Sequence, residues 1–174
     1  MNGLLSRDYQ RHKPGSFMKI KFEILYGLLY SIAGLGIGGY ISVTSIGEGY
    51  DFFWLYATLA GFLTGYLLSF FFIVRRNNYK SYNLLVIAPI VGLISHWLCW
   101  YLMAIELNVR YWIFGEHFFQ PPVNLLESLY GVFVFCLWSW LFFGWITVLW
   151  AVFAVFIARD ITSSTRSKTG YTSL

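Results

Sequence analysis

The sequence predicts an all-α membrane protein, a four-transmembrane-helix antiparallel bundle with both termini in the cytoplasm (N-in/C-in). The first observation is composition: 58% of the 174 residues are hydrophobic and only 11% are charged, whereas soluble domains carry about 25% charged residues. The second is that the apolar residues form four runs, each long enough for the roughly 20 residues that cross a bilayer. The third is that the basic residues are concentrated in alternate connections between these runs.

The first two spans are expected at residues 24–43 and 52–74. They follow a basic segment, residues 1–23, in which Pro14 and Gly15 interrupt any long helix. The first apolar run has no clear small-residue cleavage site and is longer than the apolar part of a signal peptide, so we interpret it as a retained span. Met18, which Lys19 and Lys21 follow closely, is an alternative candidate for the start of translation.

The third and fourth spans are expected at residues 84–105 and 125–158, separated by the longest loop, residues 106–124. Asn124 and Glu127 have the spacing of a helix N-cap and its capping partner. The fourth apolar run exceeds the length that a bilayer requires, so this helix must tilt or project beyond the membrane. The segment that follows, residues 159–174, is rich in Ser and Thr and is expected to be a disordered cytoplasmic tail.

The distribution of Lys and Arg predicts the orientation. The N-terminal segment, residues 75–80 and the C-terminal tail carry five, three and three of the 12 basic residues. The other two connections carry one, Arg110, together with several acidic residues. Because short loops rich in Lys and Arg stay in the cytoplasm, both termini are expected there. Compact loops, and outer connections without an Asn-x-Ser/Thr acceptor, favour a bacterial inner (plasma) membrane.

Small residues recur at helical spacing in the spans, where they would allow close approach of two backbones. We expect the first two spans to form a tight antiparallel pair that the other two complete to a bundle. The predicted helix-packing residues are Gly27, Ser31, Gly34 and Gly38 in the first span, Ala57, Gly61, Gly65 and Ser69 in the second, and Ala88 and Gly92 in the third.

His96 is the one ionisable side chain well inside a predicted span, which makes it a candidate functional residue. A proton relay would need a partner, and the apolar cores of the spans contain no Asp or Glu. The simpler interpretation is a neutral imidazole that bonds to Ser95 or to a backbone carbonyl freed by Pro89. A role in gating or binding is the alternative.

The loop at residues 106–124 is unusually aromatic, as suits the headgroup region of a membrane. It is interpreted either as a lid lying in this region or as a surface that contacts a partner. Glu116 and His117 are candidate functional polar residues, although no nucleophile or metal-ligand set accompanies them. The candidate partner-contact residues are Arg110, Tyr111, Trp112, Phe114, Phe118 and Phe119.

No motif for catalysis, a cofactor or a metal is present, so none of the three is expected. Cys99 and Cys136 each lie inside an apolar run and are interpreted as small buried side chains without a disulfide. The net charge of +4 does not indicate nucleic-acid binding, because the basic residues flank the spans and set the topology.

These observations favour a non-enzymatic membrane protein that acts through contacts with another membrane protein or with copies of itself. It would be an accessory or assembly subunit, or an immunity or exclusion protein. In size and number of spans, though in no sequence motif, the chain resembles the four-span immunity proteins that protect bacteria against pore-forming toxins. The alternatives are a channel or transporter component with a path lined by Ser, Thr and His96, and a lipid-modifying enzyme that uses Glu116 and His117.

Overall fold

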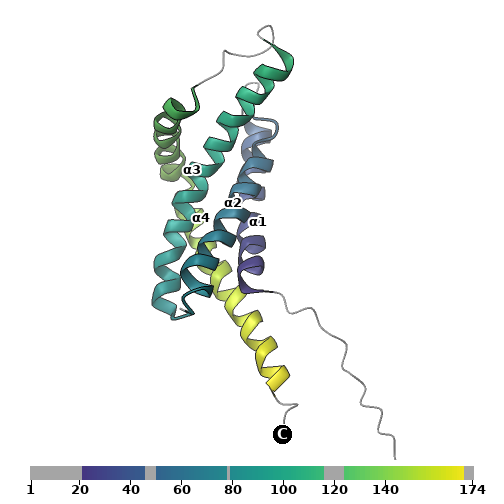
Figure 1. The fold of residues 1–174 in the computed structure, drawn as a ribbon, viewed down its shortest axis with the longest axis vertical. Coiled ribbons are helices and arrows are strands. Elements are labelled where there is room, and N and C mark those ends of the chain that lie inside the picture. Colours follow the sequence, from purple (N-terminus) through teal and green to yellow (C-terminus); the bar gives the residue numbers. More distant parts are fainter. Residues whose placement is uncertain (1–20, 46–49, 78, 116–123, 171–174) are drawn as a thin grey trace, which may run out of the picture.

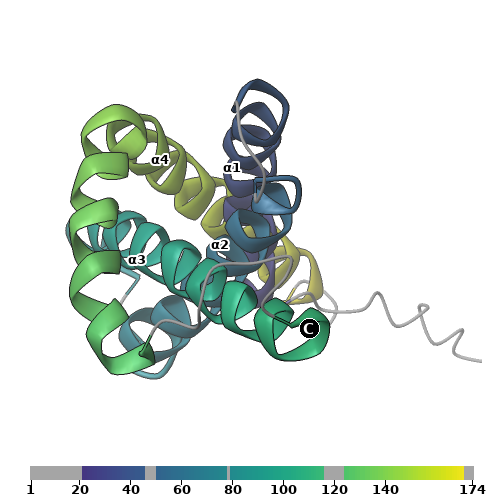
Figure 2. The ribbon, with the colours of Figure 1, turned by 90° about the horizontal axis from the view of Figure 1, so that it is seen from above.

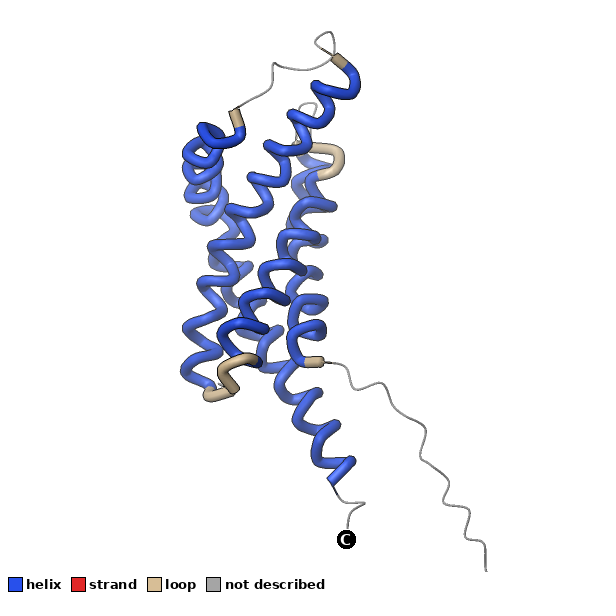
Figure 3. Tube along the Cα trace, viewed as in Figure 1, coloured by secondary structure: helices blue, strands red, loops and turns tan. Residues whose placement is uncertain are grey.

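The computed structural model describes residues 21–45, 50–77, 79–115 and 124–170. Across these residues the chain is helical, and no strand occurs among them (Figures 1 and 3). The helices are α1 (Phe22–Thr44), α2 (Phe53–Ser69), α3 (Ser81–Phe114) and α4 (Leu125–Gly170), and a short π-helix, η1 (Phe70–Val74), continues α2. All four are long and apolar enough to cross a membrane.

The helices form a ring, seen from above in Figure 2. Each packs against its neighbours along the chain, and α4 also contacts α1. The most extensive contact is between α1 and α2. The start of α1, the connection from η1 to α3 and the C-terminal end of α4 lie at the same end of the bundle (Figure 1). We call this end the basic end, because the described cations Lys21, Arg75, Arg76, Lys80 and Arg159 belong to these segments.

The α1–α2 contact is made by the predicted small residues. A Cβ atom added to Gly34 would lie 2.3 Å from the Ala57 carbonyl oxygen, and one added to Gly38 would lie 2.7 Å from the Trp54 Cα. On α2, a Cβ atom at Gly65 would lie 3.1 Å from the Gly27 Cα. The two backbones therefore touch along most of this interface.

The remaining predicted packing residues have different neighbours. A Cβ atom on Gly61 would lie 3.3 Å from the Ser31 Cα, again across the α1–α2 contact. Ser69 and Ala88 are buried. Gly92 faces α4, where an added Cβ would lie 3.3 Å from a methyl carbon of Val148.

Helix α3 extends beyond its predicted end at residue 105, so the first part of the expected aromatic loop is helical. No Pro or Gly interrupts residues 106–114, and Glu106 and Arg110 form an ion pair one turn apart that supports this segment. The helix ends at Gly115, whose φ of 82° is a conformation that glycine adopts readily.

Helix α4 continues to Gly170, whereas disorder was expected from residue 159. Extending an existing helix costs little once the first turns have formed, and the chain contains no proline after Pro122 to stop it. The Thr162 hydroxyl donates to the Ala158 carbonyl at 2.8 Å, which pairs a side chain with the helix backbone. The predicted disorder was wrong for the described part of this segment.

The buried apolar residues form two clusters. The larger lies towards the basic end and centres on Tyr26, Tyr30 and Val91, with Ala151 and Val155 of α4. The smaller contains Phe53 and Ala60 of α2 with Cys99 and Met103 of α3. The buried polar side chains include Ser95 of α3 and Thr147 of α4.

Candidate functional site

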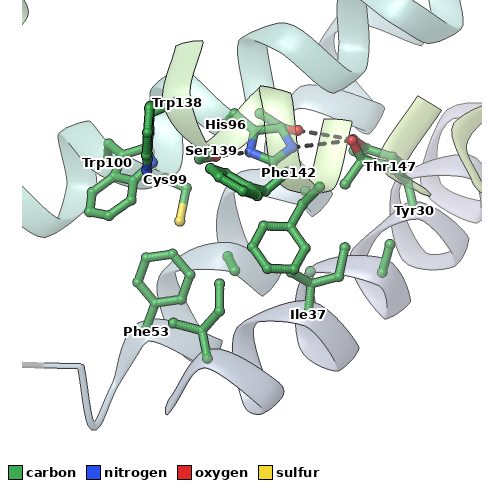
Figure 4. A pocket seen from close by; sticks show the side chains of 17 residues that line it. Tyr30, Ile37, Phe53, His96, Cys99, Trp100, Trp138, Ser139, Phe142 and Thr147 are labelled. Atoms are coloured by element: carbon green, nitrogen blue, oxygen red, sulfur yellow. Dashed lines mark hydrogen bonds between the residues drawn. The ribbon is translucent and has the colours of Figure 1, made fainter. Parts of the chain in front are cut away.

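A polar cluster from three helices lies in the bundle interior (Figure 4). His96 of α3 is bonded through both ring nitrogens to α4: Nδ1 lies 2.5 Å from the Ser139 Oγ, and Nε2 lies 3.1 Å from the Thr147 Oγ1. Beside it, the Tyr30 hydroxyl of α1 lies 2.9 Å from the Ser95 Oγ. These bonds connect α1 and α4 to α3 across the interior of the ring.

The hydrogen-bond partners assign the protons in this cluster. The Thr147 hydroxyl donates to the Gly144 carbonyl at 2.9 Å, so its oxygen must accept the bond from His96 Nε2–H. A charged imidazole is disfavoured in an apolar interior, so the ring is neutral with an unprotonated Nδ1, which accepts from the Ser139 hydroxyl. The cluster therefore holds His96 in a single tautomer.

The same reasoning applies to the second pair. The Ser95 hydroxyl donates to the Gly92 carbonyl at 2.8 Å, so Tyr30 is the donor to Ser95. Every proton of these hydroxyl groups and of the imidazole has an acceptor, either another side chain of the cluster or the carbonyl of Gly92 or Gly144. What remains available is a set of oxygen lone pairs, which can accept hydrogen bonds.

The hydrogen-bond partners of His96 differ from the predicted ones. Neither Ser95 nor a carbonyl released by Pro89 was the correct choice, since both ring nitrogens bond to α4. The sequence did contain a signal: Ser139 and Thr147 are hydroxyl residues about two helical turns apart and so lie near one face of α4. It did not show that this face meets His96.

A cavity of about 170 Å³ lies against the polar cluster, among all four helices. One wall is formed by Ser95, His96, Ser139 and Thr147 of α3 and α4. The opposite wall comes from α1 and α2 and is apolar apart from Tyr30, with Ile37, Phe53 and Ala57 among its residues. Trp100 and Trp138 line the end of the cavity away from Tyr30 and Thr147, beside Cys99 (Figure 4).

The described residues offer no metal site, because they contain no group of three or more His, Cys, Asp or Glu side chains that could hold an ion. Cys99 and Cys136 are free and buried. The Cys136 thiol lies 3.6 Å from the Leu93 carbonyl oxygen, a weak donor contact between α4 and α3.

The second candidate region is the last part of α3, away from the basic end. Arg110 forms its ion pair with Glu106 and also lies over the Phe52 ring, 5.3 Å from the centroid, which connects α3 to the start of α2. Beyond it, Trp112, Ile113 and Phe114 are 66%, 67% and 61% exposed. Tyr111 is half-buried. The remaining predicted residues, Glu116, His117, Phe118 and Phe119, lie outside the described residues.

No protein-family model matches this chain, and neither a curated protein nor a solved structure is similar to it. The class of protein is therefore defined by the fold alone. The chain is all-helical over its described residues, with four helices capable of spanning a membrane, as expected of an integral membrane protein.

Proposed function

We propose that this is a non-enzymatic, multi-pass inner-membrane protein that acts by contacting another membrane protein through the outer end of α3. The observation that carries the proposal is the exposure of Trp112, Ile113 and Phe114, each above 60%. Consecutive residues of a helix point about 100° apart. Exposure of these three side chains therefore means that most of the circumference of this helix end is not covered by the rest of the protein. Large exposed apolar surfaces of this kind mark sites of contact with a protein or membrane.

The way in which α3 is held supports a docking role. The Glu106–Arg110 ion pair and the stacking of Arg110 on Phe52 fix the helix just before its exposed turn. A rigid helix presents aromatic side chains without the entropy cost of ordering a flexible loop on binding. Aromatic residues are also the commonest hot spots of protein interfaces.

The polar cluster supports a non-enzymatic role. His96 bonds through both ring nitrogens to Ser139 and Thr147 of α4, so the imidazole joins α3 to α4. Polar side chains that pair with one another across two helices stabilise the contact between these helices in a membrane. We therefore assign His96 to the contact between α3 and α4.

The proposed topology is an antiparallel bundle in a bacterial inner membrane with both termini in the cytoplasm. Contacts between α1 and α2 run in opposite directions along the chain, with Gly27 beside Tyr66 and Gly38 beside Trp54. The positive-inside rule assigns the basic end to the cytoplasm. Single cysteines at Arg76 and Asp51, both exposed, test this in a background without Cys99 and Cys136. In intact cells, an impermeant maleimide should label residue 51 and spare residue 76, and the reverse pattern would refute the topology.

The docking proposal is tested with a photoreactive amino acid at Trp112 in native membranes. The matched control is Tyr82, which is 75% exposed but lies in the first turn of the same helix, at the basic end. We expect a discrete protein adduct from position 112, absent from position 82 and lost when Phe114 is changed to Ala. Adducts with lipid alone at position 112 would overturn the proposal. Co-expression of two differently tagged copies shows whether the adduct is a second copy of this chain.

A channel or transporter component is the second candidate, because the cavity beside His96 is lined by hydroxyl groups. It predicts solute or ion flux through the protein in reconstituted vesicles. The flux should fall when His96 is changed to Ala. Flux with this dependence would replace the contact-only proposal.

A further inference from the structure

We propose that the cavity between the four helices is a binding site for a small apolar molecule with one hydroxyl group, taken up from the bilayer. This proposal does not rest on the docking role of α3. It follows from the volume of the cavity, the position of its polar wall and the residues at its edge.

The volume of the cavity limits the size of the ligand. Protein interiors are packed closely, and voids larger than a water molecule are few. An apolar cavity of about 150 Å³ binds a molecule such as benzene. The cavity beside His96 has a volume of about 170 Å³, so a single ring or a short alkyl chain fits it.

The two walls select a molecule that is apolar except at one position. Ile37, Phe53 and Ala57 on the wall from α1 and α2 offer only apolar side chains, so that side of the ligand is hydrocarbon. The opposite wall carries the hydroxyl groups of Ser139 and Thr147 beside the imidazole of His96.

The positions of the protons in the polar cluster indicate which polar group the ligand carries. Ser139 donates to His96, and Thr147 donates to Gly144, so neither hydroxyl proton is free and both oxygens can act only as acceptors toward a ligand. A ligand hydroxyl can donate to one of them. A plain hydrocarbon has no group that could donate to these oxygens. The structure thus favours alcohols and phenols over plain hydrocarbons.

The edge of the cavity indicates the route of entry. Trp138 and Phe142 line the cavity, yet they are 63% and 55% exposed on the outer surface of α4. In a membrane this surface faces the acyl chains of the lipid. A lipophilic compound dissolved in the bilayer therefore reaches the site from the side, with no need to cross from water.

The test uses two fluorinated probes of similar size, 4-fluorophenol and 1,4-difluorobenzene, with the full chain in lipid nanodiscs and fluorine NMR as the readout. Empty nanodiscs measure partitioning into lipid. We expect saturable binding of 4-fluorophenol above that background and binding of 1,4-difluorobenzene at least about tenfold weaker, because one hydrogen bond is worth roughly that factor. Equal binding of the two probes, or no saturable binding of 4-fluorophenol, would overturn the proposal.

Two variants locate the binding. Ala33 lines the cavity, so Ala33→Phe should fill it and abolish binding. Its matched control is Ile32→Phe, at the neighbouring position of α1, which is 52% exposed and should leave binding unchanged. Unchanged affinity in folded Ala33→Phe protein would show that the probe binds elsewhere and refute the site.

Discussion

Gly34 and Ala57 bring the backbones of α1 and α2 into direct contact. A Cβ atom at position 34 would lie 2.3 Å from the Ala57 carbonyl oxygen, well inside any van der Waals distance. The neighbour is backbone, which cannot move aside as the end of a flexible side chain could. The close packing of these two helices therefore depends on the absence of a side chain at this position.

Replacing Gly34 by Ala should separate the helices and destabilise the protein. Overpacking of this kind costs about 1–3 kcal/mol. The measurement is thermal or detergent-induced unfolding, followed by circular dichroism. Gly36→Ala is the control, because a Cβ atom there has no neighbour within 4 Å and the helix propensity of Ala exceeds that of Gly. Equal stabilities of the two variants would show that the contact is looser than described.

Two tyrosines one turn apart on α1 should respond in opposite ways to the loss of their hydroxyl groups. Tyr26 is fully buried, and its hydroxyl has no hydrogen-bond partner among the described residues, so Tyr26→Phe should be neutral or stabilise by up to about 1 kcal/mol. Tyr30 donates to Ser95, so Tyr30→Phe should destabilise by about 1 kcal/mol. The measurement is the free energy of unfolding of each variant. A loss of stability in Tyr26→Phe would contradict the prediction and indicate a hydrogen-bond partner for the Tyr26 hydroxyl.

The bond between His96 and Thr147 should stabilise the packing of α3 on α4. Thr147→Val keeps the shape of the side chain but removes the acceptor for Nε2–H, which should cost about 1–2 kcal/mol. Thr58→Val is the matched control, because the Thr58 hydroxyl bonds within its own helix, to the Trp54 carbonyl. A double-mutant cycle with His96→Ala isolates the pair, and an interaction energy near zero would mean that the bond contributes nothing.

The ion pair at the outer end of α3 should be sensitive to the loss of one partner. Arg110→Met leaves the Glu106 carboxylate, whose side chain is only 13% exposed, without this counter-charge, at a cost of about 1–3 kcal/mol. Adding Glu106→Gln removes the charge and should recover part of the stability. If the double variant is no more stable than Arg110→Met, the loss arises from the Phe52 contact and not from the charge.

Much of the architecture could be predicted from local features of the sequence. A span is recognised by the apolarity of its own residues, because the bilayer acts on each helix separately. The helical spacing of Gly27, Gly34 and Gly38 likewise shows a face that permits close approach, whichever helix packs there. The positions of the four spans and the small residues of the α1–α2 contact therefore required no knowledge of the tertiary structure.

Helix ends were predicted less well. The extension of α3 to Phe114 and of α4 to Gly170 occurs in segments whose polar or aromatic composition suggested a loop or a disordered tail. Composition reports where a segment lies relative to the membrane, whereas a helix continues until its backbone is interrupted. At Phe114 that interruption is Gly115.

The sequence by itself determined that the chain has four helices long and apolar enough to cross a membrane, with His96 in the third. Only the tertiary structure decided what that histidine contacts. Its partners, Ser139 and Thr147, lie 43 and 51 residues further along the chain, and no local pattern connects them to His96. The cavity beside them is likewise a property of four helices together, because its volume depends on how far apart their backbones are held.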